Sequence, residues 1–125
     1  MILDTNALSA LADGKRDFLQ AVGPTRILSV PVVVIGEYLF GIRHSRHRRR
    51  YQEWLASNLR VFQIMPISEK TAEHYAEIRS ELKTAGRPIP SNDLWIAALA
   101  REHALPVLSR DRHFGVVEGL RILGW

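Results

Sequence analysis

Four acidic residues stand where the neighbouring sequence is apolar or where a strand is expected to end: Asp4, Glu37, Asp93 and Asp111. Burying a carboxylate is unfavourable unless it is paired, hydrogen-bonded or bound to a metal ion. Parallel strands ending before Asp4 and Asp111 would bring these two acids to one edge of a sheet. Four such charges together would repel and raise several pKa values, and a divalent cation would remove that cost. Carboxylate ligands in a chain without cysteine favour Mg²⁺ or Mn²⁺ over zinc.

Each acid taken alone also has a plainer interpretation. Asp4 belongs to a residue type that caps helices, and Asp93 suits the first turn of a helix. Asp111 could pair with a neighbouring cation: Arg110, Arg112 or His113. The prediction of a metal site therefore depends on all four acids occurring in one chain.

Hydrophobic periodicity, together with glycine and proline, predicts the elements that position these acids. The predicted strands cover residues 1–3, 26–29, 61–65, 106–109 and 120–123. The predicted helices cover residues 6–12, 15–22, 32–42, 51–59, 68–85 and 93–104. Ser68 and Asn92 are the expected caps of the last two helices, and residues 43–51 are expected to form a basic turn. Helices alternating with short apolar strands indicate an α/β fold with a parallel sheet covered on both faces.

Length and composition predict one globular domain over residues 1–125, with 46% hydrophobic and 24% charged residues. The early Asp4 argues against a signal peptide, and the longest apolar run, residues 27–36, is too short to cross a bilayer. We therefore expect a soluble, cytoplasmic protein without a membrane partner. The net charge of +4 suits a polyanionic partner.

Four segments around the acids resemble the motifs of a known family: residues 3–6 (LDTN), 36–41 (GEYLFG), 92–98 (NDLWIAA) and 109–114 (SRDRHF). They are similar to the four acidic motifs of the PIN-domain family, and most closely to VapC-type toxins of bacterial toxin–antitoxin pairs. The resemblance covers essentially the whole chain, in the order of the family's motifs. It implies a three-layer sandwich in which helices flank a central parallel sheet of four or five short strands.

The resemblance also implies an activity and partners. The family's members of this type are Mg²⁺- or Mn²⁺-dependent endoribonucleases that form homodimers and are neutralised by a VapB-like antitoxin. By this likeness Asp4, Glu37, Asp93 and Asp111 form the catalytic quartet, and Asp4, Asp93 and Asp111 hold the metal. Three polar residues match the positions that support the site: Thr5, Asn6 and Ser109.

A basic segment, residues 43–50, follows the helix that carries Glu37. It contains two histidines and five arginines: Arg43, Arg46, Arg48, Arg49 and Arg50. One interpretation is an electrostatic guide for the RNA backbone. The alternatives are a solvated turn between helices or a contact with an acidic patch of the antitoxin.

Two other functions remain open at this point. A strand ending in Asp4 also begins phosphotransferases that use an aspartyl nucleophile, but their second aspartate, two residues on, is Asn6 here. The same fold could also serve as a catalytically silent module that binds RNA or protein. The presence of all four acids argues against the silent module.

Overall fold

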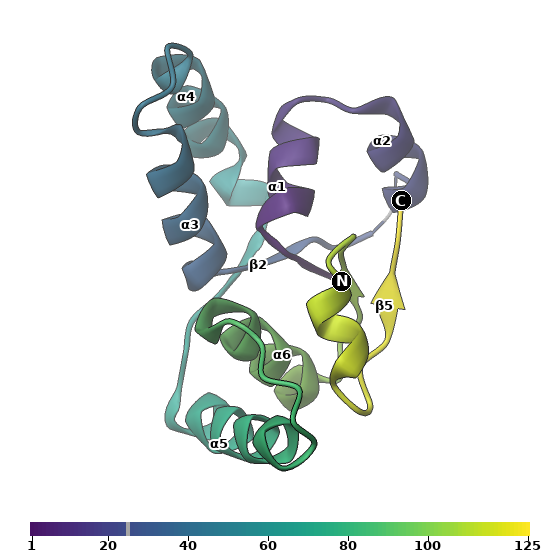
Figure 1. The fold of residues 1–125 in the computed structure, drawn as a ribbon. Helices are drawn as coiled ribbons and strands as arrows, with labels where there is room; N and C mark the ends of the chain where they lie inside the picture. The colour runs from purple at the N-terminus through teal and green to yellow at the C-terminus, as the bar shows by residue number, and fades with distance from the viewer. Residues whose placement is uncertain (25) are drawn as a thin grey trace.

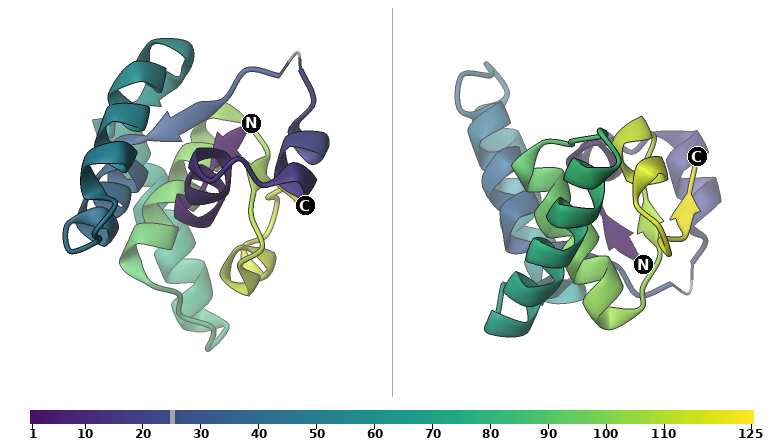
Figure 2. Two further views of the ribbon diagram at one scale, coloured as in Figure 1. Left: turned by 90° about the horizontal axis from the view of Figure 1, so that it is seen from above. Right: turned by 60° about the horizontal axis from the view of Figure 1, so that its bottom comes forward.

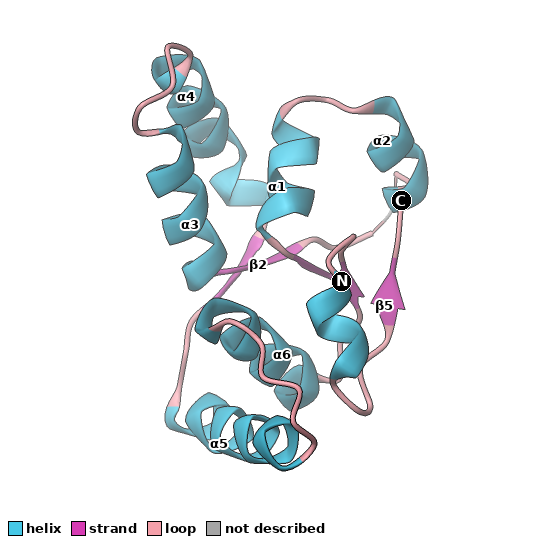
Figure 3. Ribbon diagram, in the orientation of Figure 1, coloured by secondary structure: helices cyan, strands magenta, loops and turns pink. Residues whose placement is uncertain are grey.

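The computed structural model describes residues 1–24 and 26–125. Five short parallel strands form one sheet in the order β3-β2-β1-β4-β5. Their bounds are β1 Ile2–Leu3, β2 Ser29–Pro31, β3 Gln63–Met65, β4 Val107–Leu108 and β5 Ile122–Leu123. Helices lie on both faces of this sheet, so the expected α/β fold with a central parallel sheet is confirmed (Figures 1 and 3).

Six α-helices and two 3₁₀ segments connect the described strands. The helices are α1 Thr5–Ala12, α2 Arg16–Val22, α3 Val32–Ile42, α4 Arg48–Asn58, α5 Glu69–Thr84 and α6 Ser91–His103. The 3₁₀ segments are η1 Leu59–Val61 and η2 Arg112–Val116. Helices α1 and α2 lie on one side of the sheet, α5 and α6 lie on the other, and α3 and α4 form a pair beside α1 (Figures 1 and 2).

The central strand β1 is completely buried. Ile2 and Leu3 lie between β2 and β4, where apolar residues can pack against helices on both faces of the sheet. The side chain of Asp4 caps α1 directly after this strand, so the chain changes from strand to helix at the acid itself.

Some predicted element ends were wrong. The second strand is Ser29–Pro31 rather than residues 26–29, because Ser29 aligns with Ile2 and Pro31 with Met65 in the sheet. Pro31 thus ends the strand and precedes α3, where its missing N–H costs nothing. Helix α6 begins at Ser91 after Pro90, so Asn92 lies inside the first turn and is not the cap.

Helix α4 begins at Arg48, three residues before the predicted start, so part of the expected basic turn is helical. A run of arginines is unfavourable at a helix N-terminus. Packing outweighs this cost, because Leu55 is buried and the ring of Trp54 lies 6.3 Å from that of Tyr38 and 6.2 Å from that of Phe62. None of the described helices combines the length and the apolar composition that a membrane span requires.

Candidate functional site

Asp4 is the most buried acid of the predicted quartet, with 4% of its surface exposed. One carboxylate oxygen accepts a hydrogen bond from the backbone N–H of Ala7 at 2.8 Å, and the other accepts one from the hydroxyl of Ser109. Burial raises the pKa of Asp4, and the nearby charges of Asp111 and Asp93 raise it further, while the two hydrogen bonds oppose the rise. Asp4 therefore caps α1 and also belongs to a cluster of acids.

Ser109 links Asp4 to Asp111 across two neighbouring strands. It follows β4, which pairs with β1 through Leu3 and Leu108, and only 3% of its surface is exposed. Its hydroxyl donates to Asp4 and accepts a hydrogen bond from the backbone N–H of Asp111 at 2.8 Å. The carboxyl ends of β1 and β4 thus place the two acids at the same edge of the sheet, as expected.

His113 lies between two of the acids. Its Nδ1 is 2.8 Å from a carboxylate oxygen of Asp93 and 3.1 Å from one of Asp111, and the same Asp111 oxygen accepts from the His113 backbone N–H at 2.9 Å. An ionised carboxylate only accepts, so the tautomer with hydrogen on Nδ1 donates to these acids, whereas the tautomer with hydrogen on Nε2 leaves the Nδ1 lone pair for a metal ion. Burial raises the pKa of Asp93 and the charge of Asp111 adds to the rise, whereas His113 opposes it.

Glu37 approaches the same cluster from α3. Among the described residues, one of its carboxylate oxygens is buried without a hydrogen-bond partner, and so is the hydroxyl oxygen of Thr5. Burial raises the pKa of Glu37, with smaller contributions from the charges of Asp93 and Asp4, while nearby Thr5 and Asn92 oppose the rise without forming a geometrically good hydrogen bond. The four predicted acids therefore influence one another electrostatically, and none of them forms a salt bridge with a described arginine.

Three of these side chains meet the spacing of a metal site. One ligand atom each from Asp93, Asp111 and His113 lies within 4.8 Å of the other two. Two carboxylates and one imidazole nitrogen are a donor set that Mn²⁺ accepts readily and Mg²⁺ accepts through its oxygens. The raised pKa values of Asp4, Glu37 and Asp93 fit a cation that would neutralise these carboxylates.

Sequence reasoning missed His113 as a member of the metal site and treated it as one possible partner of Asp111. The available signal was its position two residues after Asp111, within the loop that follows a strand at the sheet edge. Asn6 was predicted to support the site, but it is exposed on α1 and makes no side-chain hydrogen bond within the described part of the chain. Thr5 and Ser109 both lie beside the acids.

The five arginines of the basic segment are exposed and lie on the turn after α3 and at the start of α4. A hollow of about 270 Å³ adjoins both regions. Thr5 and Glu37 line one part of it, and Ser45 and Tyr51 line another. Ser45 of the basic segment and Glu37 therefore line the same hollow, whereas none of the five arginines belongs to its lining.

Comparison with known proteins agrees with this geometry. The profile of the PIN domain family matches residues 1–120. Ribonuclease VapC5 of Mycobacterium tuberculosis is 31% identical over 120 residues, which cover 94% of this chain and 87% of that protein. The crystal structure of VapBC-5 from the same organism has a TM-score of 0.79 at 29% identity, covering 99% of this chain and 97% of that one. VapBC2 from Rickettsia felis, solved with a promoter DNA fragment, has a TM-score of 0.87 at 24% identity, covering 99% and 97%, and shows the likeness of fold.

Proposed function

Since the chain belongs to the PIN-domain family, we propose that it is a metal-dependent endoribonuclease and the toxin of a toxin–antitoxin pair. The observation that carries the proposal is the meeting of Asp93, Asp111 and His113 within 4.8 Å, beside Asp4 and Glu37. The relatives named as ribonucleases support the choice of RNA as the substrate.

Asp4, Asp93 and Asp111 would hold a Mg²⁺ or Mn²⁺ ion. When bound, such an ion neutralises charge on a scissile phosphate and makes water more acidic, so that water can attack at neutral pH. Ser109 fixes the orientation of Asp4 by a hydrogen bond and holds the backbone of Asp111 at the same time. His113 keeps the carboxylates of Asp93 and Asp111 facing each other before the ion arrives.

Glu37 has a role different from that of the aspartates. Glu37 lines the hollow beside Thr5, where its carboxylate would accept a hydrogen bond from the attacking water. Burial raises the pKa of Glu37, which brings this carboxylate closer to the range where it accepts a proton near neutral pH. We assign Glu37 to orienting the water and removing its proton.

The proposed partners follow from the relatives. Solved neighbours are VapBC complexes, and we propose a VapB-like antitoxin and a homodimer for this chain as well. The basic segment, which borders the hollow beside Glu37, would guide the RNA backbone through Arg43, Arg46, Arg48, Arg49 and Arg50. A toxin of this kind acts on the RNA of its own cell, so we place it in the cytoplasm.

The test is cleavage of RNA by purified protein in Mn²⁺ or Mg²⁺ and in EDTA. We expect cleavage only with the metal, and a loss of about a hundredfold or more in Asp93→Asn, since the variant removes a ligand charge. Glu73→Gln is the matched control, because it removes one negative charge from an exposed position on α5. Stable RNA binding without cleavage in any metal would instead identify a silent binding module.

A further inference from the structure

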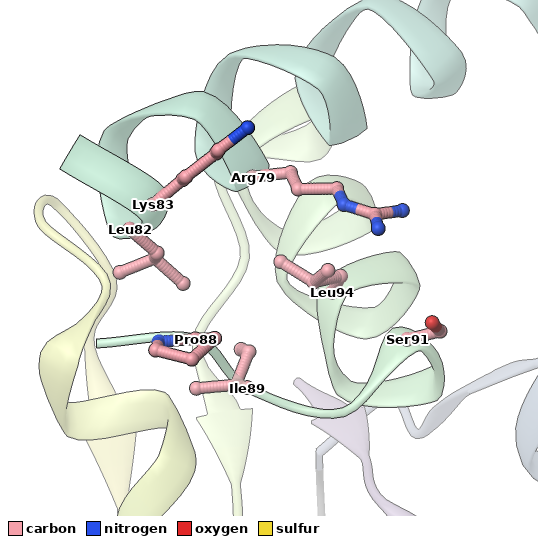
Figure 4. A pocket seen from close by; sticks show the side chains of 7 residues that line it. All are labelled: Arg79, Leu82, Lys83, Pro88, Ile89, Ser91 and Leu94. Carbon is pink, nitrogen blue, oxygen red and sulfur yellow. The ribbon is translucent and has the colours of Figure 1, made fainter. Parts of the chain in front are cut away.

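A second cavity lies on the far side of the first turn of α6, between α5 and the loop that joins the two helices. Its volume is about 350 Å³. Figure 4 shows Leu82 of α5, Ile89 of the loop and Leu94 of α6 forming its apolar lining. The cavity is separate from the hollow that adjoins Thr5 and Glu37, because the two share no lining residue.

Two cations from one helix border this apolar cavity. Arg79 and Lys83 stand four residues apart on α5; in Figure 4 Arg79 extends past Leu94, and Lys83 points away from Pro88 and Ile89. Arg79 donates a hydrogen bond to the hydroxyl of Tyr75 at 2.9 Å, which holds the guanidinium in place. In the part of the chain that the structure describes, no carboxylate lies within ion-pairing distance of either cation. An apolar lining beside two uncompensated cations is complementary to a ligand with a flat apolar part and a negative charge.

Ser91 connects this cavity to the acid cluster. It lines the cavity, whereas Asp93 of the same helical turn faces His113. The two residues are separated by about 3 Å along the axis of α6. One polymer can therefore reach both places by passing the first turn of α6.

We propose that this cavity binds a nucleotide of the single-stranded RNA that lies beyond the two nucleotides flanking the cleaved bond, with the base against the apolar lining and the phosphates on Arg79 and Lys83. The inference rests on the proposed ribonuclease function for its choice of ligand. Stacking or apolar contact with a base is tolerant of sequence, and cations that contact phosphates add affinity that salt weakens. The cavity is thus a substrate subsite that contributes to affinity for RNA and takes no part in the chemical step.

The experiment compares the double variant Arg79→Gln/Lys83→Gln with the control Lys15→Gln/Arg16→Gln. Both lower the net charge from +4 to +2, and all four residues are exposed, so folding is preserved in each. Binding of a short fluorescent single-stranded RNA is measured in EDTA by anisotropy. Cleavage of the same RNA and of a dinucleotide is measured with Mn²⁺.

In the double variant we expect Kd and KM for the longer RNA to rise about tenfold with kcat unchanged, and the salt slope of binding to fall by about 1.4, which is about 0.7 for each of two phosphates. Cleavage of the dinucleotide should equal that of the wild type, because it is too short to reach the cavity. In the control variant, the KM for the longer RNA and the salt slope of binding should both change less than in the double variant. Ile89→Ser should raise KM without changing the salt slope, since it alters only the apolar lining.

Equal losses in the double variant and the control would overturn the subsite, because only net charge would matter. So would an acidic peptide of equal charge that binds as tightly as the RNA and loses affinity equally in the double variant. If the wild type cleaves no RNA with Mn²⁺, the proposed function fails, but the comparison in EDTA still decides whether the cavity binds RNA.

Discussion

Without metal, the variant Asp93→Asn should be at least as stable as the wild type. With metal, it should be less stable than the wild type. Asparagine keeps an oxygen that accepts the hydrogen bond from His113 Nδ1, but it carries no charge. The variant therefore removes both the repulsion between Asp93 and Asp111 and a ligand charge for the ion. Without metal, the loss of repulsion stabilises the fold. With metal, the loss of a ligand charge makes the variant less stable than the wild type.

The magnitudes follow from the spacing of the ligand atoms. Two charges at the 4.8 Å limit of this cluster repel by about 3.5 kcal/mol at an effective dielectric constant of roughly 20. Solvent screening at this partly exposed site leaves about 1–2 kcal/mol. Losing the charge on the acceptor of the His113 hydrogen bond costs about 1 kcal/mol. In EDTA the variant should therefore equal the wild type or exceed it by up to about 1 kcal/mol.

Bound metal should raise the Tm of the wild type more than that of Asp93→Asn. An ion at ten times its dissociation constant adds about 1.4 kcal/mol to the free energy of unfolding, provided that the unfolded chain does not bind it. For a domain of this size that corresponds to a rise in Tm of about 5 °C. The variant should shift by less than about 2 °C at the same concentration, because it lacks one of the ligand charges.

The difference in stability between Asp93→Asn and the wild type in EDTA should increase with pH. The folded-state pKa of Asp93 is raised, so the folded protein favours the protonated acid, and stability is lost as pH rises through the folded pKa. Below the pKa of the unfolded chain this contribution is fully present. The Tm of Asp93→Asn minus that of the wild type, both in EDTA, should therefore increase between about pH 4 and pH 8, and the difference cancels the titrating groups that do not interact with Asp93.

The assay is thermal unfolding followed by circular dichroism, in EDTA and in a Mn²⁺ series, with Glu73→Gln as the control that removes an exposed charge from α5. The reasoning is refuted if wild-type Tm does not respond to Mn²⁺ or Mg²⁺. It is also refuted if Asp93→Asn responds as strongly as the control, or if the variant is less stable in EDTA at every pH.

Three further predictions concern the same site. Ser109→Ala should lower the free energy of unfolding by about 2 kcal/mol and by more at pH 7 than at pH 4, because it removes a hydrogen bond from the buried Asp4 carboxylate; denaturant unfolding at the two pH values measures this, and an equal loss at both would contradict it. Asp4→Asn should reduce kcat about tenfold more than Glu37→Gln, since it removes a ligand charge; steady-state cleavage assays compare them, and the reverse order would exchange the assigned roles. Changing Arg48, Arg49 and Arg50 to serine should lower the salt slope of RNA binding by about 0.7 for each phosphate that these arginines neutralise; an unchanged slope would remove the basic segment from the substrate path.

The sequence alone predicted the α/β fold because its apolar segments are strongly patterned. Pro31 and the glycines favoured a helix over residues 32–42, and the structure has α3 at Val32–Ile42. The same patterning placed Asp4 and Asp111 after strands of a parallel sheet, and topology then requires these acids to share an edge. Element ends were less predictable, because the start of α4 at Arg48 depends on the contacts of Trp54 with Tyr38 and Phe62.

The sequence by itself therefore determined which acids could gather, since strand order and residue type fix which carboxylates end at the sheet edge. Only the tertiary structure decided how they are connected: Ser109 bonded to both Asp4 and the backbone of Asp111, and His113 seated between Asp93 and Asp111. It also decided that α5 and α6 enclose a cavity beside Arg79 and Lys83. These features depend on side-chain directions and on contacts between segments distant in sequence, and local patterns of polarity carry no information about either.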